Sequence, residues 1–218
     1  MMKILDGQGK SKLWTDRMDV IPPSPDYQSL KDAALAHLAR FATTRQSLRQ
    51  MLQRRVRRWG VRAARAGMFA EEVAAHEAVC LPVIDQIVEE MGRLGAVDDA
   101  AFSRSRSRNL ARAGRSRRAV QAHLQARGVD GETVRQAVDE SLGEAGEEQA
   151  HQAELAAALI LARKRAVGPF HRPDRPEKEH MKVLAIFARN GFSQDVAEKA
   201  LGMDREDAED LIIGFRSL

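Results

Sequence analysis

Arginine is the residue whose numbers and spacing point most clearly to chemistry in this chain. Between Asp99 and Asp130 there are eight arginines and no acidic residue. From Ala33 to Ala70 there are nine arginines and again no acidic residue. The guanidinium group is a planar fork of donors that pairs with phosphates and carboxylates, and it stays charged at any relevant pH. The two blocks therefore predict binding of a polyanion or of an acidic protein surface.

Within these blocks, spacing selects a set of candidate contact residues. In the second block, three arginines four positions apart lie on one face of a predicted helix. The candidates are Arg104, Arg108, Arg112, Arg115, Arg117 and Arg118 in the second block, and Arg45, Arg49, Arg54, Arg55 and Arg58 in the first. On duplex DNA, each phosphate contact would steepen the salt dependence of binding by about 0.9 in log–log slope. The alternative is a solvated helix face paired with the acidic segments of neighbouring repeats.

Signals for catalysis or metal binding are weak. His76 and Cys80 share a helical face at i, i+4, which is half a metal site, but the chain has no second cysteine and no other paired ligand spacing. Neither a phosphate-cradling glycine loop nor a nucleophile elbow is present. We expect no catalytic residue, no metal, no cofactor and no enzyme activity. Trp59 could stack on a base, although core packing is favoured for it, and Phe102 and Phe192 fit apolar seams.

Composition indicates the fold class that must position these arginines. Of the 218 residues, 44% are hydrophobic but only 5% aromatic, which favours close-packed short helices, and β-branched alternation is nearly absent. The expected fold is all-α. A single cysteine fits a reducing cytosol, and no apolar run reaches signal-peptide or membrane-spanning length, so we expect a cytoplasmic protein that does not use a membrane.

Hydrophobic spacing divides the chain into helices. Residues 1–26, which end in a proline cluster, are predicted to be a flexible tail in which Trp14 could dock. Helices are expected from Tyr27, from about Thr44 to Trp59-Gly60, and from Val79 to Gly95, with 61–78 as an irregular or helical insertion. Two helices and a third after Gly131 follow. The remaining helices are expected at about 147–167, 177–190, 194–201 and 205–215, with a loop over 168–176.

These helices form a degenerate repeat. Gly60, Gly128 and Gly191 each follow a predicted short helix, with apolar residues eight and four positions before, as expected for left-handed C-terminal caps. Three copies of a three-helix unit would stack into an elongated array. The expected organisation is a tail at 1–26, repeat 1 at 27–96 with its insertion at about 61–78, repeat 2 at 97–143, and repeat 3 at 144–218 with a C-terminal extension.

Three segments of this pattern resemble the RecX regulators of bacterial recombination. They are Val97–Phe102, Arg117–Val129 and Phe187–Val196, with a looser match at Thr44–Leu48, and the likeness covers about 27–201. The departures from the family pattern are Ser47 and His123, where acids are frequent, Arg106, where an apolar or aromatic residue is usual, and Ser116, where glycine is usual.

The resemblance implies a non-enzymatic modulator of the RecA recombinase. Members of this family are curved rods of three tandem helical repeats that lie in the groove of the RecA filament on DNA. They limit strand exchange and the filament's co-protease role, and hence recombination, DNA repair and the SOS response. We therefore expect the chain to act as a monomer, to inhibit RecA, and to meet single- or double-stranded DNA through the filament, with direct DNA binding left open.

Two other functions fit parts of the sequence. A helix-turn-helix transcription regulator would use the two short helices within Ser116–Val138, although Glu132–Glu140 presents mainly acids toward any base. A protein scaffold without nucleic-acid contact is the third possibility, and binding that ignores salt would indicate it.

Overall fold

The chain folds into helices throughout the part that the structure describes. This computed structural model describes residues 20–217 except positions 175 and 177, so Trp14 and most of the predicted tail lie outside the described residues. The elements are α1 (Tyr27–Leu38), α2 (Arg45–Arg65), α3 (Ala70–Arg93), α4 (Asp99–Arg112), α5 (Arg117–Ala126), α6 (Gly131–Leu142), α7 (Glu148–Arg165), the 3-10 turn η1 (Gly168–Phe170), α8 (His180–Arg189), α9 (Gln194–Gly202) and α10 (Arg205–Ser217). The prediction of an all-α fold is confirmed.

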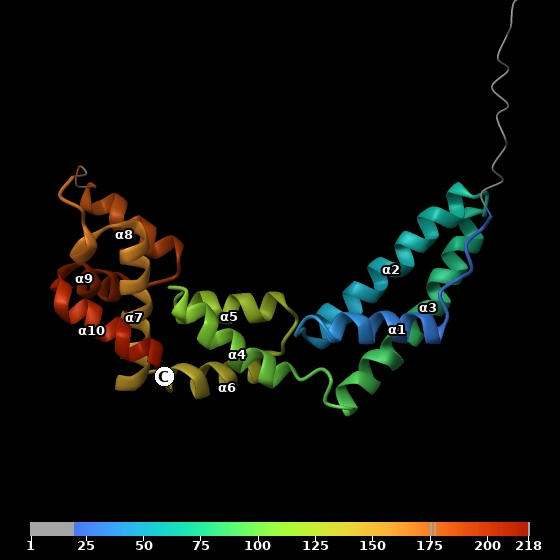
Figure 1. Ribbon diagram of the computed structural model, residues 1–218, viewed down its shortest axis with the longest axis horizontal. Helices are drawn as coiled ribbons and strands as arrows, with labels where there is room; N and C mark the ends of the chain where they lie inside the picture. Colours follow the sequence, from blue (N-terminus) through green and yellow to red (C-terminus); the bar gives the residue numbers. More distant parts are fainter. Residues whose placement is uncertain (1–19, 175, 177, 218) are drawn as a thin grey trace, which may run out of the picture.

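The helices bury three separate hydrophobic cores along an elongated, curved molecule (Figure 1). One core lies among α1, α2 and α3, the next among α4, α5 and α6, and the last among α7 to α10. Phe215 of α10 packs against both the second and the third core. Each helix group thus buries its own apolar faces and contacts only its neighbours, as in a repeat array. In Figure 1, α2 and α5 border the concave side of the curve, and α3 and α6 lie on the opposite, convex side.

Successive helix groups are connected by equivalent hydrogen bonds, each made by the hydroxyl group of an N-cap residue. The N-cap hydroxyl of α2, on Thr44, donates to the backbone carbonyl of Arg127 at the C-terminal end of α5 (2.7 Å). The N-cap hydroxyl of α5, on Ser116, donates in the same way to the carbonyl of Asn190 at the end of α8 (2.7 Å). Each hydroxyl also accepts from an amide of its own helix, so one side chain caps one helix and satisfies the end of another.

A carboxylate from the following group completes each joint. The first amide of α2, on Arg45, donates to Asp99 of α4 (2.9 Å), and the first amide of α5, on Arg117, donates to Glu154 of α7 (2.7 Å). Because these amides are among those that a helix leaves unpaired, an anion from the next group is a favourable partner. The two joints are thus built from residues at equivalent places.

The glycines that define the repeat do not all have the same role. Gly128 and Gly191 follow α5 and α8 with φ of +77° and +87°, as the C-cap prediction requires. Their α-carbons also face the joints, since a Cβ on Gly191 would lie 2.5 Å from the Ser116 hydroxyl and one on Gly128 would lie 2.4 Å from the Gln46 side chain. Glycine at these two positions therefore permits both the turn and the close approach of the neighbouring group.

The prediction that α2 ends near Gly60 is wrong. The helix continues to Arg65, and α3 begins at Ala70 rather than at Val79, so residues 61–78 extend a helical hairpin. Gly60 is buried where the two helices cross, and a Cβ there would lie 2.4 Å from Glu77 and 2.9 Å from Val73. The glycine is needed for close helix packing, which leaves the same sequence signature as a cap.

Trp59 belongs to the interior of this hairpin. Its side chain is 2% exposed, and its indole N–H donates to the carbonyl of Pro22 (2.9 Å) in the segment that precedes α1. The Cys80 thiol donates to Pro25 of the same segment (3.4 Å), and His76 packs edge-on against the indole. The core assignment for Trp59 is confirmed, and both halves of the suspected metal pair are engaged in packing.

Candidate nucleic-acid interface

Four of the eleven candidate arginines pair with carboxylates inside the molecule. These pairs are Arg45–Glu89 (3.1 Å), Arg49–Asp85 (2.6 Å), Arg104–Glu140 (3.5 Å) and Arg117–Asp139. In each case the acid lies on the third helix of the same group, α3 or α6, and is at least 22 residues away in the sequence. The acid-free stretches of sequence are therefore only partly free of acids in the folded protein.

Arg45 and Arg117 occupy equivalent positions and make equivalent contacts. Each is the first residue of the second helix of its group, and each bridges to the third helix. Arg117 also donates to the carbonyl of Gly143 (2.8 Å), and its side chain is only 17% exposed. Both arginines hold their own group together, which leaves Arg117 in particular little surface for a partner.

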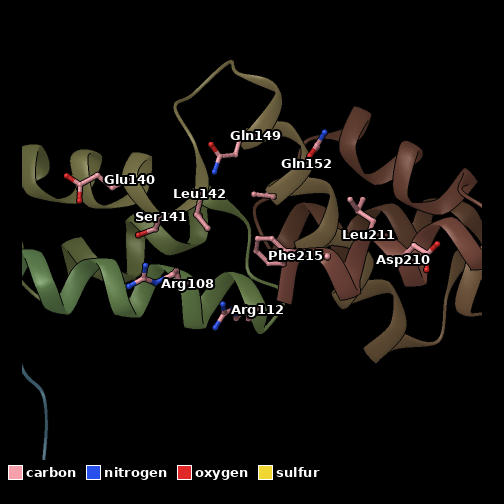
Figure 2. A pocket seen from close by; sticks show the side chains of 12 residues that line it. Arg108, Arg112, Glu140, Ser141, Leu142, Gln149, Gln152, Asp210, Leu211 and Phe215 are labelled. Carbon is pink, nitrogen blue, oxygen red and sulfur yellow. The ribbon is translucent and has the colours of Figure 1, made fainter. Parts of the chain in front are cut away.

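The central row on α4 is divided between two environments. Arg104 faces Glu140 of α6, so the row has an acidic partner at that position. Arg108 and Arg112 line a groove of about 350 Å³ where α4 and α6 meet α7 and α10. Figure 2 shows these two arginines on one side of the groove and Asp210 and Leu211 on the other. The first arginine of the row thus forms an ion pair, and the other two line the groove.

The outer half of α2 carries the densest unpaired charge. We call it the α2 arginine row, made of the exposed residues Arg54, Arg55, Arg57, Arg58, Arg62 and Arg65. None of the six has a carboxylate within ion-pair distance among the described residues. Arg54, Arg58 and Arg65 follow i, i+4, i+11 spacing on the side opposite the buried residues, a stripe about 16 Å long at 1.5 Å per residue. The stripe lies on the helix that borders the concave side in Figure 1, and α3 packs against this helix.

A second cationic cluster lies where α4 and α5 meet. Arg106 of α4 donates through Nε to Nε2 of His123 on α5 (3.2 Å). Burial lowers the pKa of His123, and the positive charges of Arg106, Arg127 and Arg115 lower that pKa further. The candidates Arg115 and Arg118 are both exposed, and neither has an ion pair within the described part of the chain.

The sequence signals for the additional residues were present but incomplete. Arg62 and Arg65 were visible in the first block, yet they join the helix that carries Arg54 and Arg58 only because α2 runs past Gly60. Arg106 and His123 stood out as departures from the family pattern, but their spacing along the chain does not indicate that they touch.

The described part of the chain meets the requirements of neither a metal site nor a membrane-spanning helix. Within residues 20–217, leaving aside the two undescribed positions, His, Cys, Asp and Glu side chains form no group of three that could hold a metal ion. The same part of the chain has no helix long and apolar enough to cross a membrane.

Comparison with known proteins identifies the family. The model for the second three-helix domain of RecX matches residues 98–138, which span α4, α5 and most of α6. The regulatory protein RecX of Myxococcus xanthus is 34% identical over 179 residues, covering 82% of this chain and 86% of that protein. The chain belongs to the RecX family.

Other RecX proteins align over shorter ranges. The regulatory protein RecX of Agrobacterium fabrum is 38% identical over 117 residues, which cover 54% of this chain and 58% of that protein. The protein of the same name from Thermobifida fusca is 36% identical over 137 residues, 62% of this chain and 68% of its own length. No solved structure matches significantly.

The names of the relatives bear on enzyme activity, and the geometry of α5 and α6 bears on the helix-turn-helix alternative. These relatives are named as regulatory proteins, and none of the names describes an enzyme. In the helix-turn-helix alternative, α6 would read bases, but it exposes Glu132 and Glu140 along with Arg135, and Arg135 pairs with Glu132. No feature of α5 and α6 favours that reading.

Proposed function

We propose that this RecX-family chain inhibits the RecA recombinase by lying along the RecA–DNA filament with its concave side inward. The observation that carries the proposal is the α2 arginine row: it is exposed, it has no ion pair among the described residues, and its helix borders the concave side of the curved array (Figure 1). Binding there would limit strand exchange and filament-dependent repair and SOS signalling in the cytoplasm, with the chain acting as a monomer and without catalysis.

The dimensions of the row suit a charged filament. Duplex DNA carries one negative charge per about 1.7 Å of axis, so a stripe about 16 Å long faces several phosphates at once. Guanidinium groups pair equally well with phosphates and with carboxylates, so the same row fits either the DNA or an acidic strip of the recombinase. An elongated array with separate cores presents a long surface without requiring one large domain.

The decisive experiment measures inhibition of RecA strand exchange by the full chain. The test variant combines Arg54→Glu, Arg58→Glu and Arg65→Glu, three residues that make no hydrogen bond or ion pair among the described residues. We expect the concentration for half-inhibition to rise at least about tenfold, because three charge reversals remove several phosphate or carboxylate contacts. Circular dichroism should show unchanged helicity.

A matched control carries Arg93→Glu, Arg172→Glu and Arg216→Glu, which change the net charge equally at exposed sites away from the row. This control should inhibit like the wild type. If the wild-type chain neither binds nor inhibits RecA at micromolar concentration, the proposal fails. If both triple variants lose activity equally, net charge rather than the α2 arginine row is responsible.

A further inference from the structure

The contact between Arg106 and His123 has an unusual electrostatic setting. A guanidinium group can only donate, so Nε2 of His123, 3.2 Å from Nε of Arg106, must be the acceptor. The imidazole is therefore neutral in this arrangement, with its proton on Nδ1. Both side chains are partly buried, so solvent screens the site incompletely.

Every charged group that acts on this histidine is positive. Arg106 comes from α4, Arg115 from the segment between α4 and α5, and Arg127 from the end of α5, one turn after His123. Asp130 is the nearest acid in the sequence, and its carboxylate instead caps α6 by accepting from the Thr133 amide (2.9 Å). One arginine thus contacts the neutral acceptor and two more act on it through their charge, and none of the three has an ion pair among the described residues.

Other arginines at helix–helix contacts do have a carboxylate partner. Arg45, Arg49, Arg104 and Arg117 each have a carboxylate on the adjacent helix. At the α4–α5 contact the place of a counter-ion is taken by a histidine. Since converging like charges in a partly buried place raise the free energy, an external anion would be favoured there.

We infer that Arg106, Arg115, His123 and Arg127 form a binding site for a phosphate group whose occupation is coupled to protonation of His123. Phosphate accepts several hydrogen bonds from guanidinium forks, and a protonated imidazole adds a further donor. When His123 takes up a proton, it stops accepting from Arg106, which frees that Nε–H for the phosphate. The phosphate can be free in solution or can belong to a nucleic-acid backbone, and the chemistry of recognition is the same.

The coupling has a definite sign. Without a bound anion, burial and the positive charges of the arginines keep the pKa of His123 below its ordinary value of 6.5. A bound anion stabilises the imidazolium and raises that pKa, so binding takes up a proton. Affinity for phosphate should therefore increase as the pH falls through the pKa of the occupied state, and it should level off below the pKa of the free state.

The position of the site connects it to the array. The backbone carbonyl of Arg127 accepts the Thr44 hydroxyl at the first joint, and α2 starts one residue after Thr44. A phosphate held by Arg127 would thus lie beside the point where the first and second helix groups meet. The site itself does not depend on the proposed action on RecA.

NMR of the histidine side chains tests the inference without any recombinase. The full chain would be titrated from pH 5.5 to 8 alone, with inorganic phosphate, and with a short single-stranded oligonucleotide in phosphate-free buffer. We expect the His123 resonances to shift on addition of ligand and the pKa of His123 to rise. The exposed His151 of α7 serves as the internal reference and should not respond.

Two variants separate the anion site from the proton coupling. Arg106→Gln should weaken binding about tenfold or more, whereas His123→Gln should retain binding but lose its dependence on pH. A response to inorganic phosphate alone would indicate a small-anion site, and a response to the oligonucleotide a backbone site; either supports the inference. An unchanged His123 pKa with both ligands in the wild-type chain would overturn it, whatever the outcome of the recombinase assay.

Discussion

The arginines of α2 and α4 look alike in the sequence and differ in the folded chain. Both segments are dense in arginine, and neither has an acid between its arginines. Arg104 of α4 nevertheless faces Glu140 on α6, whereas the outer half of α2 extends beyond Asp85 and Glu89, the acids of α3 that pair with its inner half. Whether an arginine is available to a partner therefore depends on the helix packed beside it. The local charge density identifies a segment that could bind an anionic partner, and tertiary packing determines which of its arginines are available for that contact.

The largest expected effect is a difference between α2 and α4 variants in the salt dependence of DNA or filament binding. We predict that replacing Arg54, Arg58 and Arg65 with Gln reduces the log–log salt slope of duplex-DNA or filament binding by up to about 2.7, at about 0.9 per contact. The corresponding α4 variant, with Gln at positions 104, 108 and 112, should reduce it by less than about 1.8, because Arg104 already has a partner. Fluorescence anisotropy between 50 and 200 mM salt, roughly the range where such slopes are measurable, gives both values. Equal losses would show that internal pairing does not decide availability.

The next effect compares two equivalent ion pairs that differ in exposure. Asp139→Asn removes the partner of Arg117, whose side chain is 17% exposed, and should lower the free energy of unfolding by about 1–3 kcal/mol. Glu89→Gln removes the partner of Arg45, which is 43% exposed, and should cost less than about 1 kcal/mol. Urea denaturation followed by circular dichroism measures both. A greater loss at Glu89 would contradict the view that Arg117 is the more structural of the two.

A smaller effect concerns the second joint and pH. Burial raises the pKa of the Glu154 carboxyl above its usual range, and the amide and charge of Arg117 oppose this only in part. The folded state thus holds this proton more tightly than the unfolded state, so the contribution of Glu154 to stability decreases as the pH rises above its unfolded pKa. Glu154→Gln keeps an acceptor for the Arg117 amide and should flatten this decrease. Glu154→Ala loses the acceptor and should cost about 1 kcal/mol at neutral pH. Thermal unfolding between pH 4 and 8 gives the comparison, and an unaltered pH profile in the Gln variant would refute the assignment.

The sequence predicted the features that depend on local spacing. Gly128 and Gly191 end their helices as expected, and the apolar residues before them are buried. Gly60 has the same local pattern, but its requirement comes from α3, which crosses it 13 to 17 residues later in the chain. A glycine needed for close packing and a glycine needed for a left-handed turn are indistinguishable without the partner helix.

Pairing between helices could not be read from the sequence for the same reason. The acids that neutralise Arg104 and Arg117 lie 36 and 22 residues away, and nothing in their spacing specifies which arginine they meet. Arg106 and His123 contact each other only because α4 packs against α5. The sequence therefore located the cationic segments, while the pairing had to come from the fold.

The finest distinction is whether an α4 arginine becomes available when its partner is removed. Glu140→Gln leaves Arg104 without a carboxylate, and since both side chains are more than a third exposed, stability should change by less than about 0.5 kcal/mol. The salt slope of duplex binding should increase by up to about 0.9 if the freed guanidinium reaches a phosphate. Glu144→Gln makes the same change in net charge at an exposed residue with no ion pair among the described residues. If both variants increase the slope equally, overall charge governs binding; an increase in Glu140→Gln alone would show that α6 controls whether α4 can bind.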